Sequence, residues 1–508
     1  MKAYQNDTKA KKKGGFGAPS EQLRIAITFK RKSDGLGPTT FAAPMSAASA
    51  LSFRPDPVDV DLALHELDRR GFTTTGRGAL TASVRGTRAQ FEKVFGTSLS
   101  VFKLDPTKPY EFHSFYFPAD GAPWNPDPAL MQLIDDAYIQ WPHIYMAAKH
   151  KVPSGPKAGS GGGAVTPGAK PPHVNKWHLD VPTDVARLLN ATPVHLAGGS
   201  GKGVRICMVD TGFAHSHPFF AAHGYKSSVS LAQGATNRDT DPGSHGTGES
   251  ANVFSIAPGA TFIGVKLTDD ADLSGGASIL EGFQEALKHN PHVITISMGY
   301  DLRAAGTNDP LATLPQSLKA LEAEIHDAVA NGVVVVFSAG NGHYSFPGQM
   351  PDVLSAGGVF VDQANAMRAS DYASAFKSLI YSGRSVPDCS GLVGLLPFGD
   401  YLMLPVPSGQ QLDKEEAAHD GTTPTDGWAL FSGTSAAAPQ LAGVCALLLE
   451  KNPALKPSDV KAILMRTARI VKTGHANPAS DSAGAGETAE NGAAGTGLVD
   501  AHAAWLQA

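Results

Sequence analysis

The stretch FSGTSAAAPQLAG, residues 431–443, joins a polar turn built on Gly433 to an apolar helix that the sequence predicts over Leu441 to Leu449. The turn presents the hydroxyl of Ser435 at the start of this helix, where peptide N–H groups and the positive end of the helix dipole favour negative charge. A serine that only caps a helix has the same local pattern. Ser435 is therefore a candidate nucleophile that needs a base, an orienting acid and an oxyanion donor elsewhere in the chain.

Two polar residues follow apolar runs that are typical of buried strands. Asp210 comes after residues 204–209, and Asn341 comes after residues 333–340. The side-chain amide of Asn341 can donate a hydrogen bond into a cleft, or its oxygen can accept a turn N–H. Because the carboxyl ends of parallel strands meet at one edge of a sheet, we expect both side chains near the same crevice.

His245 supplies the candidate base. It lies within GSHGTG, residues 243–248, where glycines on both sides suit a histidine at a crowded site that opens a helix. An exposed loop histidine is the plain alternative for one of 18 histidines. With all parts present, Ser435 would attack a carbonyl and His245 would take its proton. Asp210 would fix the imidazole ring, and Asn341 would hold the oxyanion together with the Ser435 N–H.

Three other motifs point to different chemistry, and each lacks a required part. Asp-Thr-Gly at 210–212 is also typical of aspartic proteases, which need a second such carboxylate that this chain does not contain. A phosphate-binding loop fails because Leu196 stands at its first glycine and Gly203 follows its lysine. His215 and His217 lack a third ligand at metal-binding spacing, so we expect surface residues there and predict no metal site.

Apolar strands alternate with helical segments from residue 181 to residue 508, the range that we assign to a catalytic domain. This alternation predicts an α/β fold with a parallel sheet that is flanked by helices on both faces. The expected strands are 204–210, 261–267, 292–298, 332–338 and 354–359, and the expected helices are 279–289, 315–330 and 457–467.

A smaller unit, residues 21–147, precedes this domain. Its order is close to β-α-β-β-α-β, which predicts a small α+β (ferredoxin-like) domain with two helices on one face of an open sheet. The expected strands and hairpin are 23–29, 72–84, 98–104 and 110–117, and the expected helices are 58–70, 87–95 and 126–138. Residues 1–20 are predicted to be a disordered tail. Residues 148–180, which contain PSGPKAGSGGG, predict a flexible linker with a cleavage site.

Composition excludes several classes of function. The chain has 508 residues and a net charge of −5, which leaves room for a large core and gives no basis for binding nucleic acid. Its three cysteines, Cys207, Cys389 and Cys445, lie far apart and are expected to be buried free thiols. No apolar run of 18 residues and no apolar stretch after the N-terminal lysines is present. We therefore expect no membrane partner and no signal peptide, and either a cytoplasmic location or export by a non-standard route.

Residues 201–508 resemble a subtilisin-type serine protease. The motifs that carry this resemblance are VDTG (209–212), HGT (245–247), ISMG (296–299), SAGN (338–341) and GTSAAAP (433–439), with weaker matches at VPD (386–388) and GLVDA (497–501). The chain order Asp, His, Ser is that of subtilisin. The resemblance implies a cleft that binds the substrate as an added strand. It places Ser297, Met298, Gly299, Ala339 and Gly340 along that cleft.

Two departures from this family pattern concern cofactors and the cleft. After the HGT motif the family usually has another histidine and a long loop that helps to bind calcium. Here Gly248 and Glu249 follow, and Ala257-Pro258 arrives within a dozen residues. We therefore predict that this calcium site is missing and that no cofactor is needed. An insertion at 395–430 is longer than in the smallest members and is expected to shape one side of the cleft.

Residues 23–141 are similar to the pro-domains of sedolisins, above all at LTASVRGT (80–87) and FEKVFG (91–96). Sedolisins use a Ser-Glu-Asp arrangement, whereas here His245 stands at the base position and Glu249 has no Asp four residues on. The resemblance implies a pro-domain that assists folding and blocks the cleft until the linker is cut.

The sequence thus predicts a serine endopeptidase that is made as a zymogen, acts on protein or peptide substrates, and has its own pro-domain as an intramolecular inhibitor. Two alternatives stay open. One is a catalytically silent or peptide-ligating relative. The other is an exopeptidase whose cleft is partly closed by the 395–430 insertion.

Overall fold

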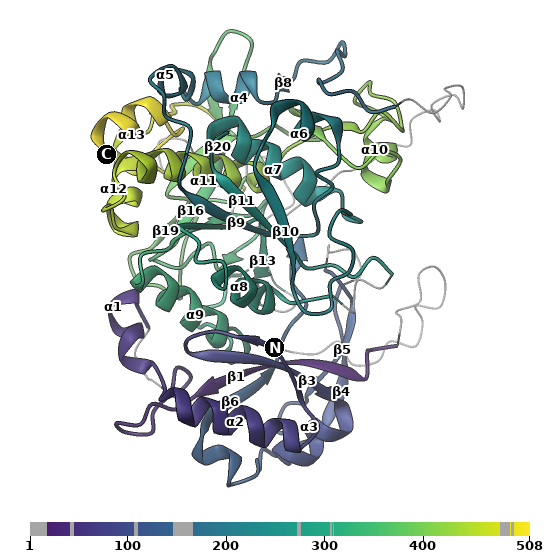
Figure 1. Ribbon diagram of the computed structural model, residues 1–508, viewed down its shortest axis with the longest axis vertical. Coiled ribbons are helices and arrows are strands. Elements are labelled where there is room, and N and C mark those ends of the chain that lie inside the picture. Colours follow the sequence, from purple (N-terminus) through teal and green to yellow (C-terminus); the bar gives the residue numbers. More distant parts are fainter. Residues whose placement is uncertain are drawn as a thin grey trace.

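The computed structural model describes residues 18–40, 45–105, 110–145, 166–271, 276–304, 307, 309–477, 488 and 492–508. Figure 1 shows a smaller N-terminal unit beneath a larger unit that contains the main sheet. Most of the predicted tail and of the predicted linker with its cleavage site lies outside the described residues. None of the described helices is both long and apolar enough to cross a membrane.

The larger unit is built on an eight-stranded sheet with the order β10-β11-β9-β12-β14-β16-β17, in which β20 also pairs with β16. All pairs are parallel except the edge pair of β16 and β17. The strands are β9 (Arg205–Asp210), β10 (Ser227–Leu231), β11 (Thr261–Lys266), β12 (Val293–Ile296), β14 (Val334–Ser338), β16 (Leu354–Val361), β17 (Met367–Ala369) and β20 (Cys389–Leu392). The expected α/β fold is confirmed.

Two pairs of helices cover the two faces of this sheet. The helices α7 (His245–Ile256) and α11 (Thr434–Lys451) pack on one face, and α8 (Ile279–Leu287) and α9 (Lys319–Ala330) pack on the other. In β9, Ile206 and Met208 face the first core, whereas Cys207 and Val209 face the second. Burial on both faces explains why these strands are continuous apolar runs. The three cysteines are buried and free, as predicted.

The N-terminal unit has its own apolar core and an antiparallel four-stranded sheet with the order β2-β3-β1-β6. Its elements are β1 (Gln22–Phe29), α2 (Pro57–Arg69), β2 (Thr73–Arg77), β3 (Thr81–Thr87), α3 (Arg88–Phe95) and β6 (Ile134–Ile139). The helix α2 begins at Asp56, whose carboxylate accepts the Val58 N–H, and α3 begins with a capping box formed by Thr87 and Gln90. In Figure 1 the two helices lie on the side of the sheet that is away from α8 and α9.

The predicted helix 126–138 is wrong. The structure has a short 3-10 turn, η2 (Leu130–Gln132), and then the strand β6. Ala137 and Ile139 of β6 pair with Ile27 and Ile25 of β1. The spacing of apolar residues favours a helix locally, but pairing with β1 is more favourable. Strand β6 completes the edge of the sheet and buries its apolar side chains against β1.

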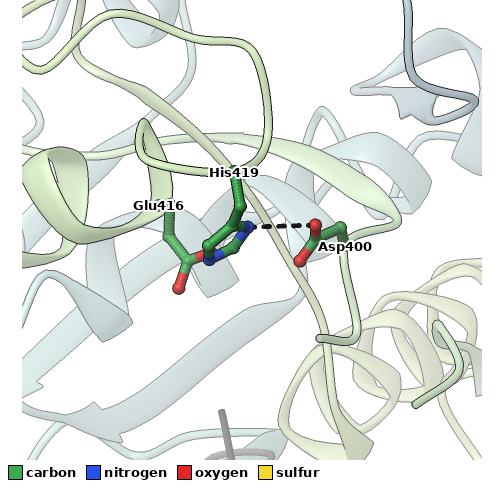
Figure 2. A group of neighbouring side chains, drawn as sticks. All are labelled: Asp400, Glu416 and His419. Atoms are coloured by element: carbon green, nitrogen blue, oxygen red, sulfur yellow. Dashed lines mark hydrogen bonds and ion pairs between the residues drawn. The ribbon is translucent and has the colours of Figure 1, made fainter. Parts of the chain in front are cut away.

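Smaller sheets join segments that are distant in the sequence. One has the order β15-β13-β7, and another has the order β22-β21-β8. The 395–430 insertion contains β21 and α10, and it brings together Asp400, Glu416 and His419 (Figure 2).

The remaining elements are α1 (Ala47–Ala50), η1 (Leu51–Phe53), β4 (Leu99–Lys103), β5 (Ser114–Pro118), β7 (Ile144–Tyr145), β8 (Leu179–Asp180), α4 (Thr183–Leu188), α5 (Thr192–Leu196), α6 (Pro218–His223), β13 (Met298–Asp301), η4 (Gln316–Leu318), β15 (Ser345–Phe346), β18 (Phe376–Lys377), β19 (Ser385–Val386), β21 (Leu402–Pro405), α10 (Gln411–Glu416), β22 (Trp428–Phe431), α12 (Pro457–Thr467) and α13 (Ala501–Gln507).

Candidate active site

Asp210 and His245 form a buried pair at the carboxyl end of β9. The Nδ1 atom of His245 lies 2.8 Å from Oδ1 of Asp210, an oxygen that also accepts the Thr211 N–H. Burial lowers the pKa of His245, but the neighbouring acids, Asp210 first among them, together raise the pKa above its ordinary value. The pairing leaves Nε2 as the ring atom that can exchange a proton with another group.

The start of α7 is held tightly against this strand end. A Cβ atom at Gly246 would lie 2.3 Å from the Gly212 carbonyl oxygen, so only glycine lets the helix come this close. The carboxylate of Asp241 accepts hydrogen bonds from the hydroxyls of Thr211 and Thr247 and from the Thr247 N–H. Burial raises the pKa of Asp241 to about 6. Sequence reasoning missed Asp241, because nothing in its local pattern distinguishes it from an ordinary loop acid.

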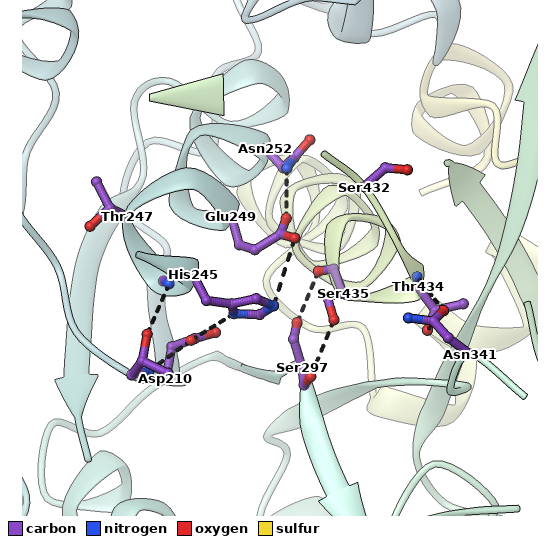
Figure 3. A network of polar contacts seen from close by, with 12 residues as sticks. Asp210, His245, Thr247, Glu249, Asn252, Ser297, Asn341, Ser432, Thr434 and Ser435 are labelled. Atoms are coloured by element: carbon purple, nitrogen blue, oxygen red, sulfur yellow. Dashed lines mark hydrogen bonds and ion pairs between the residues drawn. The ribbon is translucent and has the colours of Figure 1, made fainter. Parts of the chain in front are cut away.

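Ser435 is the second residue of α11, and its surroundings depend on a proline one turn later. Pro439 has no N–H, so the Ser435 carbonyl lacks its usual intrahelical partner. The Ser297 hydroxyl donates to that carbonyl instead, at 2.9 Å. The Ser435 hydroxyl donates in turn to the Ser297 carbonyl, at 3.3 Å (Figure 3). Strand β12 and helix α11 are thereby locked together at the serine.

Asn341 lies beside Ser435 (Figure 3). This position is the one expected for a side chain that lines the same crevice. Its Oδ1 atom accepts hydrogen bonds from the Thr434 N–H and the Thr434 hydroxyl, both at 3.0 Å. The turn from β14 runs through Ala339 and Gly340, where a φ of 103° favours glycine. Because the carbonyl branch of the Asn341 side chain is held by Thr434, its NH₂ group is the branch that can donate to a ligand.

The expected cleft residues Met298 and Gly299 lie on β13, which is already paired with a strand from the N-terminal unit. Strand β7 runs antiparallel to β13, with Ile144 opposite Gly299 and Tyr145 opposite Met298. A segment that precedes the catalytic domain in sequence thus adds a strand at the predicted substrate position.

His217 is buried and His215 is half-buried, which corrects the expectation that both are surface residues. The ring of His215 packs against Phe220, and Nε2 of His217 lies 2.9 Å from the Gly427 carbonyl oxygen. Burial lowers the pKa of both rings to about 4, so both are neutral at pH 7. Apolar packing in the interior, which the sequence spacing does not reveal, accounts for the pair.

The cluster in the 395–430 insertion contains side chains of the types that bind divalent ions. His419 lies between two carboxylates, with Nδ1 3.1 Å from Asp400 and Nε2 3.1 Å from Glu416 (Figure 2). The hydrogen bond to Glu416 raises the pKa of His419, and Asp400 acts in the same direction. The Lys176 ammonium also contacts Asp400. Lys176 and a protonated His419 would balance the two carboxylates, so we interpret the cluster as an ion-pair network. The predicted lack of a metal stays a prediction.

The comparisons with known proteins now decide the family. The model of the subtilase family, Peptidase_S8, matches residues 201–497, which is more than half of the chain. The chain belongs to the subtilase family. This membership supports a serine protease of the subtilisin type.

Individual relatives agree with the family assignment. The chain is 25% identical to subtilisin E of Bacillus subtilis (strain 168) over 312 residues, which cover 58% of this chain and 68% of that protein. It is also 25% identical to subtilisin of Bacillus pumilus, over 57% of this chain and 91% of that one. The crystal structure of fervidolysin from Fervidobacterium pennivorans, a keratinolytic enzyme related to subtilisin, superposes with a TM-score of 0.52 at 16% identity. The superposition covers 97% of this chain and 62% of fervidolysin, and it supports the fold alone.

Proposed function

We propose that this subtilase is a serine endopeptidase that works through an acyl-enzyme and is made as a zymogen. Ser435 attacks the peptide carbonyl, while His245 accepts the hydroxyl proton and passes it to the leaving amine. Asp210 holds the imidazole in the required tautomer through Nδ1. The developing oxyanion is bound by the Asn341 amide and the Ser435 N–H.

The pairing of β7 with β13 is the observation that carries this proposal. Since Ile144 lies opposite Gly299 and Tyr145 opposite Met298, the chain of β7 runs toward Ser297, which is hydrogen-bonded to Ser435. An extended peptide in this position gains main-chain hydrogen bonds and leads its next bonds toward the nucleophile. We expect the substrate to bind in the same way, and we expect self-cleavage in the segment that begins at residue 146.

Docking of the N-terminal unit supports its proposed role as pro-domain. The Glu324 carboxylate on α9 accepts the N–H groups of Ala79, Leu80 and Thr81 at 3.1, 2.7 and 2.6 Å. On α8, Gln284 bonds the hydroxyls of Ser83 and Thr81. The antiparallel order β2-β3-β1-β6 with two crossing helices supports the ferredoxin-like topology. A unit that binds to α8 and α9 and places β7 along the cleft would block substrate binding until it is cut and released.

The serine hydroxyl must move before it can react. In this structure it donates to the Ser297 carbonyl, and Nε2 of His245 has no hydrogen-bond partner among the described residues. Rotation about the Ser435 Cα–Cβ bond would turn the hydroxyl from Ser297 toward Nε2. We assign this rotation to productive binding of the scissile bond, because catalytic hydrogen bonds often tighten only in the reacting complex.

A fluorophosphonate probe and product masses test the proposal together. We expect the wild-type chain to carry one covalent label on Ser435 and to cut internal bonds of an unstructured protein. Ser435→Ala should show neither result. Ser432→Ala is the matched control, because this neighbouring hydroxyl donates to the Gly399 carbonyl and should leave labelling intact. Labelling without hydrolysis would indicate a ligase, release of single terminal residues an exopeptidase, and no labelling a silent relative.

A further inference from the structure

A second carboxyl group lies on the opposite edge of the His245 ring from Asp210. Glu249 follows His245 by one helical turn on α7, so both side chains lie on the same face of the helix. Its Oε1 atom is 3.9 Å from Nε2 of His245 (Figure 3). Asp210 lies at Nδ1 of the same ring. The imidazole therefore has one carboxyl group at each nitrogen.

Glu249 is fully enclosed, and among the described residues His245 is its only cationic partner. Its side chain is 1% exposed, and within the described residues no lysine or arginine forms an ion pair with it. Burial raises the pKa of Glu249 to about 8, although His245 acts against this effect. Oε1 and the facing Nε2 of His245 both lack a hydrogen-bond partner in the part of the chain that the structure describes. Two buried polar atoms thus face each other across a short gap.

A chain of amides fixes the orientation of Glu249. The Gln440 Oε1 atom accepts the Leu392 N–H at 2.7 Å, which assigns Nε2 of Gln440 as the donor to Oδ1 of Asn252 at 3.0 Å. Asn252 must then present its own NH₂ to Glu249, and it donates to Oε2 at 2.9 Å. Oε1 is the oxygen left to face the ring. Such a directed relay between α11 and α7 is more than the packing of one buried acid requires.

We propose that Glu249 is a positioning residue of the catalytic triad, which holds a carboxyl group at the Nε2 edge of His245 and so controls how readily this ring takes up the serine proton. This inference rests on the proposed function of His245 as the base. Glu249 does not touch the substrate and acts only through the ring.

The direction of the effect follows from how the two groups share protons. When Glu249 carries a negative charge, it stabilises the protonated imidazole, which cannot accept the proton of Ser435. Asp210 and Asp241 also face the ring, and Asp210 faces Glu249. Among the described residues, the elements packed on α7 add no further charge there. Strand β21 is uncharged, Arg205 lies at the other end of β9, α11 carries Glu450 and Lys451 at its far end, and Asp184 and Arg187 of α4 pair with each other. Removing the Glu249 carboxyl should therefore let His245 lose its proton at a lower pH.

The pH dependence of kcat/KM for peptide hydrolysis tests this role. We expect Glu249→Gln to move the acidic limb to lower pH by about one unit, the size typical of losing one charge within 4–6 Å. Glu322→Gln is the matched control, because this buried carboxyl on α9 bonds Tyr381 and should leave the limb in place. An acidic limb that stays put in Glu249→Gln, or that moves to higher pH, would overturn the proposal. Glu249→Met is a second variant of similar size, and it should shift the limb in the same direction.

A second measurement does not depend on peptidase activity. In the full chain carrying Ser435→Ala and ¹⁵N-labelled histidine, NMR titration reports the protonation of His245 directly. We expect the His245 midpoint to fall when Glu249→Gln is added and to stay when Glu322→Gln is added. An unchanged midpoint would reject the role of Glu249 even if the chain proves to be a peptidase. A lowered midpoint in a chain that resists fluorophosphonate would keep the coupling and reject only the proposed function.

Discussion

Each of the two helix pairs that cover the main sheet carries a buried glutamate, and the two glutamates differ in their hydrogen-bond partners. On α9, Glu324 accepts three backbone N–H groups and the Thr81 hydroxyl from the N-terminal unit. On α7, Glu249 accepts one hydrogen bond from Asn252, and its other oxygen faces His245. Burial raises the pKa of both acids, to about 7 and about 8. A carboxyl group whose bonds are all made serves docking, whereas one with an open oxygen beside a base can serve chemistry.

The largest effect should come from a substitution in the catalytic group that Glu249 adjoins. Ser435→Ala removes the nucleophile, and in subtilisin the loss of the serine or histidine costs about 2 × 10⁶ in kcat. We expect a similar loss in peptide hydrolysis, and an uncut chain by mass spectrometry. The contacts of the N-terminal unit with α8 and α9 should be intact, since Glu324 and Gln284 are unchanged. Cleavage of the purified variant after residue 145 would show that processing does not depend on this serine.

A smaller loss should follow from removing the side-chain oxyanion donor. Asn341→Ala should lower kcat by roughly 10²–10³, the cost of one such donor, with little change in KM. Steady-state kinetics on a peptide substrate measure this split. Asn331→Ala is the control, because that amide bonds Asp327 at the end of α9 and lies outside the site. Equal kcat values for the two variants would remove Asn341 from the oxyanion hole.

Removing the contacts that Glu324 makes with the N-terminal unit should release this unit faster. Glu324→Ala leaves two buried N–H groups and one partly buried N–H group without their acceptor. Each buried group left unpaired costs about 1–3 kcal/mol, so activity should appear at least roughly 10-fold sooner after processing. Burial beneath the docked unit raises the pKa of Glu324 from 4.5 to about 7, although the hydrogen bonds from Leu80, Thr81 and Ala79 act against this effect. The net free energy of docking is therefore most favourable below pH 4.5 and weakens as the pH rises through 7. The rate of activation should therefore rise with pH in the wild type and lose much of this dependence in the variant. Glu322→Ala, on the same helix, should activate as the wild type does.

The smallest predicted effect concerns the helix that carries the nucleophile. Pro439→Ala restores an N–H that would bond the Ser435 carbonyl and compete with the Ser297 hydroxyl. One hydrogen bond is worth about 0.5–1.5 kcal/mol, so kcat/KM should fall by roughly 2–10-fold, and docking should be unaffected. An unchanged kcat/KM would show that the contact between Ser297 and Ser435 is structural only.

Much of the main sheet was predictable, because strands buried on both faces are continuous apolar runs and the intervening helices are long. The strands 261–267 and 354–359 and the helix 457–467 match β11, β16 and α12 closely. The β6 segment was mispredicted because its spacing of apolar residues fits a helix, and only β1, more than 100 residues away, makes it a strand. His215 and His217 were misplaced for a similar reason, since their burial depends on distant aromatic and loop residues.

The chain alone was sufficient to predict Asp210, His245, Asn341 and Ser435 as candidate site residues, because each stands in a short glycine-rich motif at a strand end or helix start, and such motifs are local. Tertiary structure was needed to find Asp241 beneath the start of α7, β7 paired with the cleft strand, and Glu249 at the Nε2 edge of His245. Helical spacing puts Glu249 on the face of His245, but it does not reveal burial or the missing cation. Those properties arise only when α11 and β21 pack against α7. A carboxyl group that looks like an ordinary polar helix residue in the sequence therefore becomes part of the site only in the fold.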